Sequence, residues 1–379
     1  MIKDLINKKV LASNVMLIPK FAAWARDNGA KYLLTLGEPD FTTPEPIKEA
    51  CIQAIQDNKT KYSLSLGNLD FRERISAYEA RVNNAHYEPD EILITSGNTE
   101  GITAVLLTIL NPSDEVIVLT PGYPLYPSIT NFAGGIAVRL DTSKHQFQVT
   151  PEMLEAAITP KTKAIVITSP SNPTGTILNQ ASLTAIYEAA KKHRFFIVAD
   201  DCYNQIVFDG KAPVISQFED VKELVVICQS LSKSYAMTGW RLGYILATAE
   251  FLEEVMKVHE YVISGVSTFS QDGGRQAMDY DPTAMVDSYR MRRDYLYKRL
   301  KNMGLEVVKP EGAFYAFPSI KKFGLGSWEF CSRLVLEEEV AFMPGICFEA
   351  DDFVRISYCV EMEVIVEAMD RLERFIARL

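Results

Sequence analysis

The sequence lacks the features that mark several classes of protein. Its six cysteines include no CxxC pair and its four histidines share no metal-ligand spacing, so neither a disulfide framework nor a structural zinc site is expected. No run of 18 apolar residues is present, which argues against a membrane span. Acidic residues outnumber basic ones, 49 to 39, and no basic cluster is visible, which argues against nucleic acid or an anionic membrane as a partner.

The N-terminal residues 1–9 contain no apolar stretch of the kind found in secretory signals, so we expect a cytoplasmic protein with reduced thiols. The chain has 379 residues, of which 47% are hydrophobic and 23% charged. These values are typical of a soluble globular protein with a large core, and the length favours two domains.

Between residues 46 and 280, apolar strand-like runs alternate with helical patterns. The runs are Glu91–Thr95, Val116–Thr120, Ala164–Thr168, Phe195–Ala199 and Leu224–Cys228, and helix candidates include Thr99–Leu110 and Ala181–His193. Such alternation predicts an α/β fold, in which helices sandwich a mostly parallel sheet. We expect this large domain to span residues 46–280.

The pattern changes after residue 280. A charged helix over Tyr289–Met303 precedes the apolar segment Leu305–Val308, the aromatic run Phe314–Phe317 and a last helix near Val364–Arg378. This order resembles a smaller α+β domain, formed by residues 281–379 together with residues 1–45.

Each strand-like run of the large domain ends in a polar or glycine-rich turn. In open α/β sheets the ligand lies at the carboxyl ends of the strands. The turns are Ser96–Thr99, Pro121–Pro124, Ser169–Gly175, Asp200–Tyr203 and the segment around Lys233. We therefore expect these turns to form one site.

Lys233 follows the last of these runs and lies among small hydroxyl residues. An amine that attacks a carbonyl group needs a partly buried setting, because desolvation lowers its pKa. Ser230, Ser232 and Arg241 nearby would suit a phosphate group. A lysine beside a phosphate pocket indicates pyridoxal 5′-phosphate (PLP). A lone lysine in a loop is more often a solvated surface residue, and the neighbours of Lys233 are what favour the site.

Three other turns carry candidate residues that also fit ordinary structural roles. Gly97 and Asn98 begin a helix whose free N–H groups could bind an anion, although Asn98 or Thr99 could simply cap that helix. Asp200 ends a buried run and could pair with a protonated pyridine nitrogen, with Asp201 as the competing candidate or a turn aspartate as the alternative. Asn172 lies in a proline-flanked turn, which could present its amide or serve only as a turn.

Four motifs in this order resemble the class I/II aminotransferases of PLP fold type I. They are Gly37-Glu38-Pro39-Asp40, Ser171-Asn172-Pro173-Thr174-Gly175, Ser232-Lys233-Ser234 and Gly239-Trp240-Arg241-Leu242-Gly243. Within that family the chain is most similar to the bacterial N-acetyldiaminopimelate and aromatic aminotransferases, a group that the segment 309–318 also fits.

The resemblance implies a role for each candidate residue around the cofactor. Lys233 matches the lysine that forms the Schiff base with PLP and moves the proton at Cα. Asp200 matches the partner of the pyridine nitrogen, and Tyr203 and Asn172 match the partners of the ring oxygen. Tyr123 matches the ring that stacks on the pyridine. The phosphate cradle is matched by Gly97, Asn98, Ser230 and Arg241.

The resemblance also implies how substrate is held and how subunits cooperate. Arg355 matches the arginine that binds the substrate α-carboxylate with its planar fork, and Gly37 matches the loop that closes over the substrate. Tyr62 matches a tyrosine that reaches the phosphate in the neighbouring subunit, which implies a homodimer with shared active sites.

Two segments depart from the family pattern. Val15–Phe21, which often contacts the substrate side chain, contains Pro19 where many relatives have glycine or a polar residue. Segment 264–269 has no arginine at the place where aspartate-specific members bind the distal carboxylate. These departures argue against aspartate as the amino-acid substrate, and they leave open which substrate side chain is accepted.

The resemblance predicts an aminotransferase of amino-acid biosynthesis that moves an amino group from an L-amino acid to a 2-oxo acid. The candidate donors are N-acetyl-LL-2,6-diaminopimelate and aromatic amino acids, and 2-oxoglutarate is the expected acceptor in a ping-pong mechanism. A carbon–sulfur β-lyase of the same fold is the alternative. A PLP-binding regulator is a more remote alternative. Such a regulator needs an added N-terminal DNA-binding module, but the aminotransferase pattern of this sequence already includes Gly37.

Overall fold

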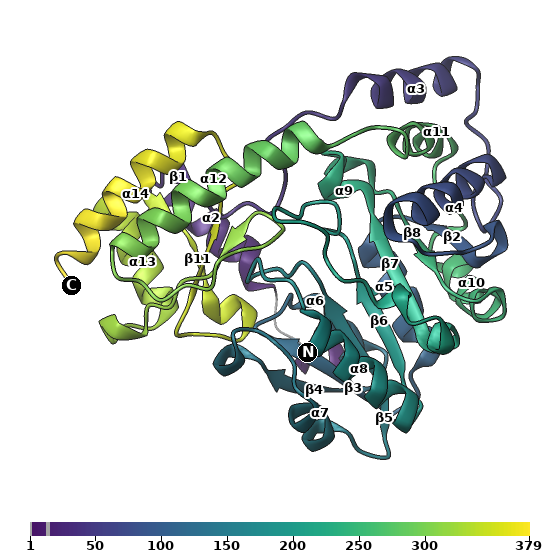
Figure 1. Ribbon diagram of the computed structural model, residues 1–379, viewed down its shortest axis with the longest axis horizontal. Helices are drawn as coiled ribbons and strands as arrows, with labels where there is room; N and C mark the ends of the chain where they lie inside the picture. The colour runs from purple at the N-terminus through teal and green to yellow at the C-terminus, as the bar shows by residue number, and fades with distance from the viewer. Residues whose placement is uncertain (1, 13–15) are drawn as a thin grey trace.

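The computed structural model describes residues 2–12 and 16–379, and a seven-stranded β-sheet forms the centre of its larger part (Figure 1). The strand order is β2-β8-β7-β6-β5-β3-β4. Strand β8 is antiparallel to both of its neighbours and the other pairs are parallel. The strands are β2 (Ile92–Thr95), β3 (Glu115–Thr120), β4 (Ile136–Asp141), β5 (Thr162–Thr168), β6 (Phe196–Asp200), β7 (Val225–Ser230) and β8 (Gly243–Leu246).

All five predicted strands are present, whereas β4 and β8 were not predicted. Strand β4 lies at the edge of the sheet, and only Ala137 and Leu140 of its six residues are buried, so it lacks a continuous apolar run. Strand β8 is only four residues long and begins at Gly243, inside the segment that we interpreted as a phosphate site. Strand β4 therefore lacks the usual signal of a buried strand, whereas Tyr244, Ile245 and Leu246 of β8 form a short apolar run that we did not interpret as a strand.

Helices cover both faces of this sheet, because successive strand residues point to opposite sides. In β6, Ile197 and Ala199 pack into one core and Val198 packs into the other. The first core is covered by α3 (Glu45–Gln56), α4 (Leu69–Asn83), α7 (Pro151–Ala157), α8 (Gln180–His193) and α11 (Thr268–Ala277). The second is covered by α5 (Asn98–Ile109), α6 (Leu125–Phe132) and α10 (Ala249–Ile263). This arrangement confirms the predicted fold class.

A third core lies beside the sheet and joins the two ends of the chain. Leu34 O accepts a hydrogen bond from Ser357 N at 3.0 Å, and Glu339 O accepts one from Tyr32 N at 3.1 Å. Its elements are α2 (Leu17–Asp27), β1 (Tyr32–Leu33), α12 (Thr283–Asn302), β9 (Tyr315–Ala316), α13 (Ser327–Glu338), β10 (Val340–Ala341), β11 (Met343–Pro344), β12 (Val354–Ser357) and α14 (Met362–Ile376). The domain limits at residues 45/46 and 280/281 stay a prediction.

Short elements complete the described chain. The helix α1 spans Lys8–Ala12, and the one-turn helix α9 spans Leu231–Ser234. The 3-10 helices are η1 (Ile2–Leu5), η2 (Pro89–Glu91), η3 (Ser143–His145), η4 (Ile215–Gln217), η5 (Glu219–Leu224), η6 (Thr238–Trp240), η7 (Lys321–Phe323) and η8 (Gly345–Phe348). The apolar segment Leu305–Val308 forms neither helix nor strand.

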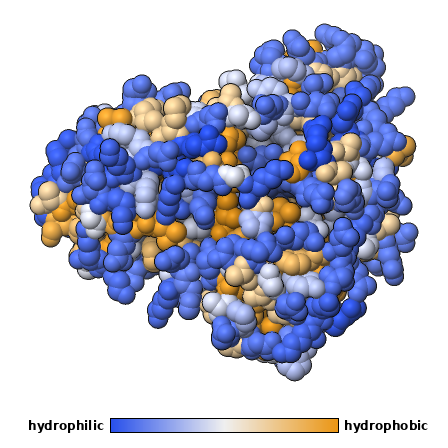
Figure 2. All heavy atoms as spheres, in the orientation of Figure 1, coloured by the Kyte–Doolittle hydropathy of each residue, from blue (hydrophilic) through white to orange (hydrophobic). Residues whose placement is uncertain are grey.

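The surface is mostly hydrophilic on the face shown in Figure 2, with apolar residues in small groups. Within residues 2–12 and 16–379, no helix combines the length and apolarity needed to cross a membrane. All six cysteines are free thiols, and five of them are buried.

Candidate active site

A cavity of about 310 Å³ lies at the carboxyl ends of the strands, where the predicted turns meet. Strands β2 and β7 are both antiparallel to β8, so they run in the same direction, and the turns after β2, β3, β5, β6 and β7 share one edge of the sheet. Ten of the predicted residues line the cavity: Gly37, Asn98, Tyr123, Asn172, Asp200, Tyr203, Ser230, Lys233, Arg241 and Arg355. Gly97 and Tyr62 do not.

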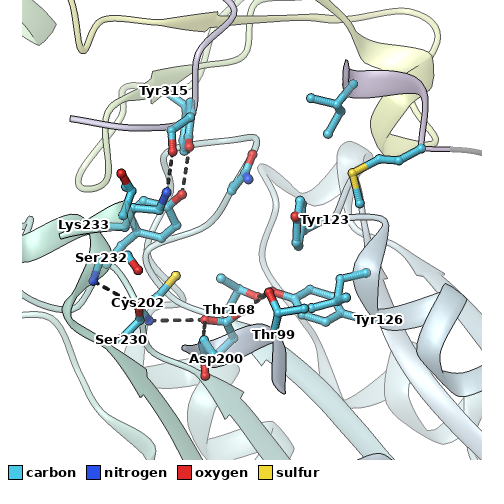
Figure 3. A pocket seen from close by; sticks show the side chains of 18 of the residues that line it. Thr99, Tyr123, Tyr126, Thr168, Asp200, Cys202, Ser230, Ser232, Lys233 and Tyr315 are labelled. Carbon is cyan, nitrogen blue, oxygen red and sulfur yellow. Dashed lines mark hydrogen bonds between the residues drawn. The ribbon is translucent and has the colours of Figure 1, made fainter. Parts of the chain in front are cut away.

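Lys233 projects into this cavity from α9, directly after β7 (Figure 3). Its Nζ donates a hydrogen bond to Gly37 O. Burial lowers the pKa of Lys233 below that of an exposed lysine. Ser230 caps the N-terminus of this helix, and its Oγ accepts a hydrogen bond from Ser232 N at 3.1 Å. The structure therefore presents an amine that is easier to deprotonate than a surface lysine.

Asp200 lies at the end of β6, on the floor of the cavity (Figure 3). One carboxylate oxygen accepts a hydrogen bond from Asn98 Nδ2 at 2.6 Å, and the other accepts one from Tyr126 OH at 2.7 Å. Burial raises the pKa of Asp200, and these hydrogen bonds oppose that rise. The contacts fix both oxygens of the carboxylate.

The Asp201 side chain lies on the opposite side of the sheet from Asp200, because successive side chains along a strand point to opposite faces. It is buried but does not line the cavity. Burial, together with the charges of Asp200 and Glu79, raises the pKa of Asp201 to about 8. Of the two competing aspartates, only Asp200 faces the cavity.

The turn before α5 brings the backbone close to Arg241. Gly97 has φ 73°, and a Cβ added there would lie 2.7 Å from Arg241 Nη2, so a side chain would collide with the guanidinium group. Neither Asn98 nor Thr99 caps the helix, because Gly97 occupies the N-cap and the Asn98 side chain binds Asp200. The capping interpretation was therefore wrong, and the Asn98 backbone is left to face an anion.

Arg355 is fully buried, 2% exposed, on β12. Its Nη1 donates to Asn172 Oδ1 at 2.9 Å and its Nη2 donates to Thr35 O at 2.8 Å, while Nε has no partner. The guanidinium lies 4.5 Å from the centre of the Tyr315 ring. Among the described residues it forms no ion pair. Because Asn172 Oδ1 accepts from Arg355, its Nδ2 donor is left to face the cavity.

Tyr315 and Tyr126 line the cavity but were not predicted as site residues. The Tyr203 and Tyr315 hydroxyl groups are 2.8 Å apart, and a Cβ added at Gly37 would lie 3.0 Å from Tyr315 OH. Tyr315 belongs to the segment 309–318 that supported the resemblance, so the sequence offered a reason to predict it as a site residue. For Tyr126 the only indication in the sequence was its position one helical turn after Tyr123.

Three apolar side chains form part of the cavity wall: Met16, Ile18 and Leu125. Met16 and Ile18 belong to the segment Val15–Phe21, in which we expected contacts with the substrate side chain. Val15 itself lies outside the described residues. The only lysine and arginine side chains among the described lining residues are Lys233, Arg241 and Arg355.

Tyr62 is 92% exposed and lies away from the cavity of its own chain. It borders a separate surface hollow, together with Ser63 and Gly265. A tyrosine in this position can act only on a site outside its own cavity.

Comparisons with known proteins place the chain in a family. A model of the family described as "Aminotransferase class I and II" matches residues 30–372. The chain is 37% identical to the "probable N-acetyl-LL-diaminopimelate aminotransferase" of Bacillus subtilis (strain 168), over 99% of this chain and 97% of that protein. It is 36% identical to aromatic-amino-acid aminotransferase 2 of Thermococcus litoralis, over 90% of each chain.

A solved structure of aspartate aminotransferase from Thermus thermophilus with maleate matches the fold with a TM-score of 0.92 and 33% identity, over 97% of this chain and 99% of that one. The chain belongs to the class I and II aminotransferases. Members of this family depend on PLP, and the protein is a PLP-dependent aminotransferase.

The charges around the cavity fit PLP and an amino acid. Asp200 is a buried anion that pairs with no cation among the described residues, and Arg355 is a buried cation that pairs with no anion there. Burying unpaired charges is costly, so the site needs a ligand with a cationic N–H group at one end and a carboxylate at the other. A protonated pyridine and an α-carboxylate meet these two demands. Within the described residues, no cluster of His, Cys, Asp or Glu is arranged to bind a metal ion.

Proposed function

We propose that the protein transfers the amino group of an L-amino acid to a 2-oxo acid by a ping-pong mechanism, with Lys233 as the lysine that carries the cofactor. The proposed donor is N-acetyl-LL-2,6-diaminopimelate or an aromatic amino acid. The proposed acceptor is 2-oxoglutarate, for which the resemblance is the only support. The observation that carries the proposal is Arg355, a fully buried guanidinium with a free Nε and no carboxylate partner among the described residues.

The residues that would contact the substrate each have a defined task in this proposal. Arg355 binds the substrate α-carboxylate, and the Tyr315 ring and Asn172 hold its guanidinium in place. Lys233 takes the proton from the substrate Cα and returns it, and its lowered pKa increases the fraction of neutral amine available as base. Bound PLP supplies an electron-deficient ring that stabilises the negative charge developing at Cα.

The residues around the ring and the phosphate would hold the cofactor. Asp200 keeps the pyridine nitrogen protonated, and Tyr203 and Asn172 Nδ2 donate to the ring oxygen. Tyr123 covers the ring. The backbone at Gly97 and Asn98, together with Ser230 and Arg241, binds the phosphate. Supporting this assignment, these residues lie together around one cavity or, for Gly97, directly behind Arg241.

The cavity wall favours donors with an apolar side chain. Met16, Ile18 and Leu125 offer apolar surface, which suits an aromatic ring or the methylene chain of N-acetyl-LL-2,6-diaminopimelate. With Lys233, Arg241 and Arg355 already assigned, the described residues that line the cavity provide no further cation for the distal carboxylate of aspartate. Relatives carry both kinds of name, and others of similar identity are named aspartate aminotransferase, so the choice rests on the cavity wall.

We further propose a cytoplasmic homodimer in which Tyr62 completes the site of the partner. Supporting this, Tyr62 is 92% exposed, and the nearby Leu64 and Tyr261 are 65% and 94% exposed. Large exposed apolar side chains close together are typical of a protein–protein interface.

A panel of amino donors with 2-oxoglutarate, ranked by kcat/KM, tests the substrate proposal. N-acetyl-LL-2,6-diaminopimelate or an aromatic amino acid should rank above aspartate. A panel led by aspartate would refute the assignment. Steady keto-acid formation from cystathionine without any acceptor would instead identify a β-lyase.

Lys233→Ala tests the role of the lysine. The variant should lose both turnover and the visible absorbance of the bound cofactor while its far-UV circular dichroism stays unchanged. Turnover near the wild-type rate would show that another group carries the cofactor and moves the proton.

A further inference from the structure

We propose that His259 and Glu100 form a positioning pair, which holds the turn at residues 96–98 in the shape that binds the cofactor phosphate. The inference rests on the proposed function, in which this turn contacts that phosphate. The two residues come from different helices: Glu100 from the first turn of α5, and His259 from α10. Neither lines the cavity.

The contacts form a short chain from α10 to the turn. His259 Nδ1 lies 3.1 Å from Glu100 Oε1, and Glu100 Oε2 accepts a hydrogen bond from Ser96 N at 3.1 Å. A carboxylate only accepts hydrogen bonds, so Nδ1 carries the proton in this contact. The two oxygens of Glu100 thus tie the backbone just before the helix to a side chain on the neighbouring helix.

Burial makes this arrangement specific. His259 is 0% exposed and the side chain of Glu100 is 9% exposed. Nε2 of His259 has no partner among the described residues, so Glu100 is the ring's only polar contact there. Burying an imidazole is costly, and a purely packing position would be filled at lower cost by an apolar side chain.

Strand β8 also packs against the turn. A Cβ added at Gly243 would lie 3.3 Å from Asn98 N and 3.1 Å from Thr95 Oγ1, so the strand backbone packs closely there. The turn therefore contacts both β8 and the Glu100 side chain. Its position matters for the phosphate, because Gly97 approaches Arg241 there.

Charge gives a second reason for the pair. The Glu100 carboxylate lies at the same helix N-terminus that would bind the phosphate, and two anions close together repel each other. The hydrogen bond from His259 directs Glu100 toward α10. Without it, the long Glu100 side chain is free to turn, and the Ser96 backbone loses a fixed partner.

The test compares the affinity of the apoprotein for PLP with its affinity for pyridoxal, which lacks the phosphate. His259→Leu should weaken PLP binding by about tenfold, because a hydrogen bond to a charged group is lost. Pyridoxal binding should stay within about threefold of wild type, since it does not use the phosphate turn. Glu100→Leu, which keeps a side chain of similar size but accepts neither hydrogen bond, should give the same phosphate-dependent loss.

Two further variants separate positioning from general loss of stability. His259→Asn places an amide donor near the position of Nδ1 and should restore most of the PLP affinity. Val255→Ala removes buried volume from the same helix and should lower the melting temperature without changing the ratio of PLP to pyridoxal affinity.

Several results would overturn the inference: equal weakening of both ligands, no weakening in His259→Leu and Glu100→Leu, or no recovery in His259→Asn. A phosphate-specific loss in Val255→Ala would also do so. A wild-type protein that binds PLP no better than pyridoxal would instead refute the phosphate site of the proposed function.

Discussion

At the scale of single residues, Asp200 and Asp201 show how one position along a strand decides a role. The two aspartates are adjacent, but the pleat sends them to opposite faces of the sheet, and only Asp200 lines the cavity. Asp200→Ala should lower kcat by about a thousandfold, because a buried charge loses its partner.

Asp201→Ala is the matched control for this prediction. Its carboxyl group has a pKa raised to about 8 and lies behind the cavity, so the variant should retain most of its kcat. Steady-state measurements of kcat for Asp200→Ala and Asp201→Ala, with the same amino donor, show which aspartate is needed. If Asp201→Ala were the more damaged enzyme, the pyridine partner would be Asp201.

Arg355 gives the second prediction at this scale. Arg355→Ala should lower kcat/KM by about thirtyfold or more for every amino and keto acid, because each shares the α-carboxylate and a desolvated charge pair is lost. Arg355→Lys keeps the positive charge but loses the planar guanidinium group. Its kcat/KM should lie between those of the wild type and Arg355→Ala. Cofactor absorbance should survive in both. A loss confined to one class of substrate would place Arg355 in the side-chain pocket.

At the scale of elements, the loop after β5 approaches the strand that carries Tyr315. Gly175 has φ 70°, and a Cβ added there would lie 2.2 Å from Tyr315 O. Gly175 O also accepts hydrogen bonds from Glu311 N at 2.8 Å and Gly312 N at 3.0 Å. Gly175→Ala should therefore push β9 away and lower the free energy of unfolding by about 2–4 kcal/mol.

Gly324 is the matched control, since its φ is 66° and no atom lies within 4 Å of an added Cβ. Gly324→Ala should cost only about 1–2 kcal/mol, the strain of the left-handed backbone. Urea unfolding of the two variants measures the difference. Equal costs would show that the Tyr315 strand moves freely to admit the methyl group.

At the scale of the whole molecule, the exposed Tyr62 predicts that two subunits share each site. Inactive Tyr62→Ala and Lys233→Ala proteins, mixed under conditions that exchange subunits, should regain about a quarter of the wild-type activity, because half of the dimers are hybrids with one intact site. Native mass spectrometry checks that hybrids form. Hybrids without activity would mean that each chain completes its own site.

The sequence by itself determined the parallel sheet, the order of the polar turns and the family. Buried strands carry long apolar runs, and five such runs with turns after them suffice to predict where a ligand binds. Local motifs also predicted Lys233, Asp200 and Arg355 as site residues, and all three line the cavity. The edge strand β4 was missed because Arg139 interrupts its apolar residues, and the short strand β8 was missed because it begins inside the motif assigned to the phosphate site.

Only the tertiary structure decided which side chains meet across long distances in the chain. Tyr126 and Asn98 reach Asp200 from two different helices, and Tyr315 joins Tyr203 across 112 residues. Asn98 is predicted as part of the phosphate cradle, and the structure adds that its side chain takes Asp200 as its partner. Such pairings depend on how helices and strands pack, and no local pattern of residues records that packing.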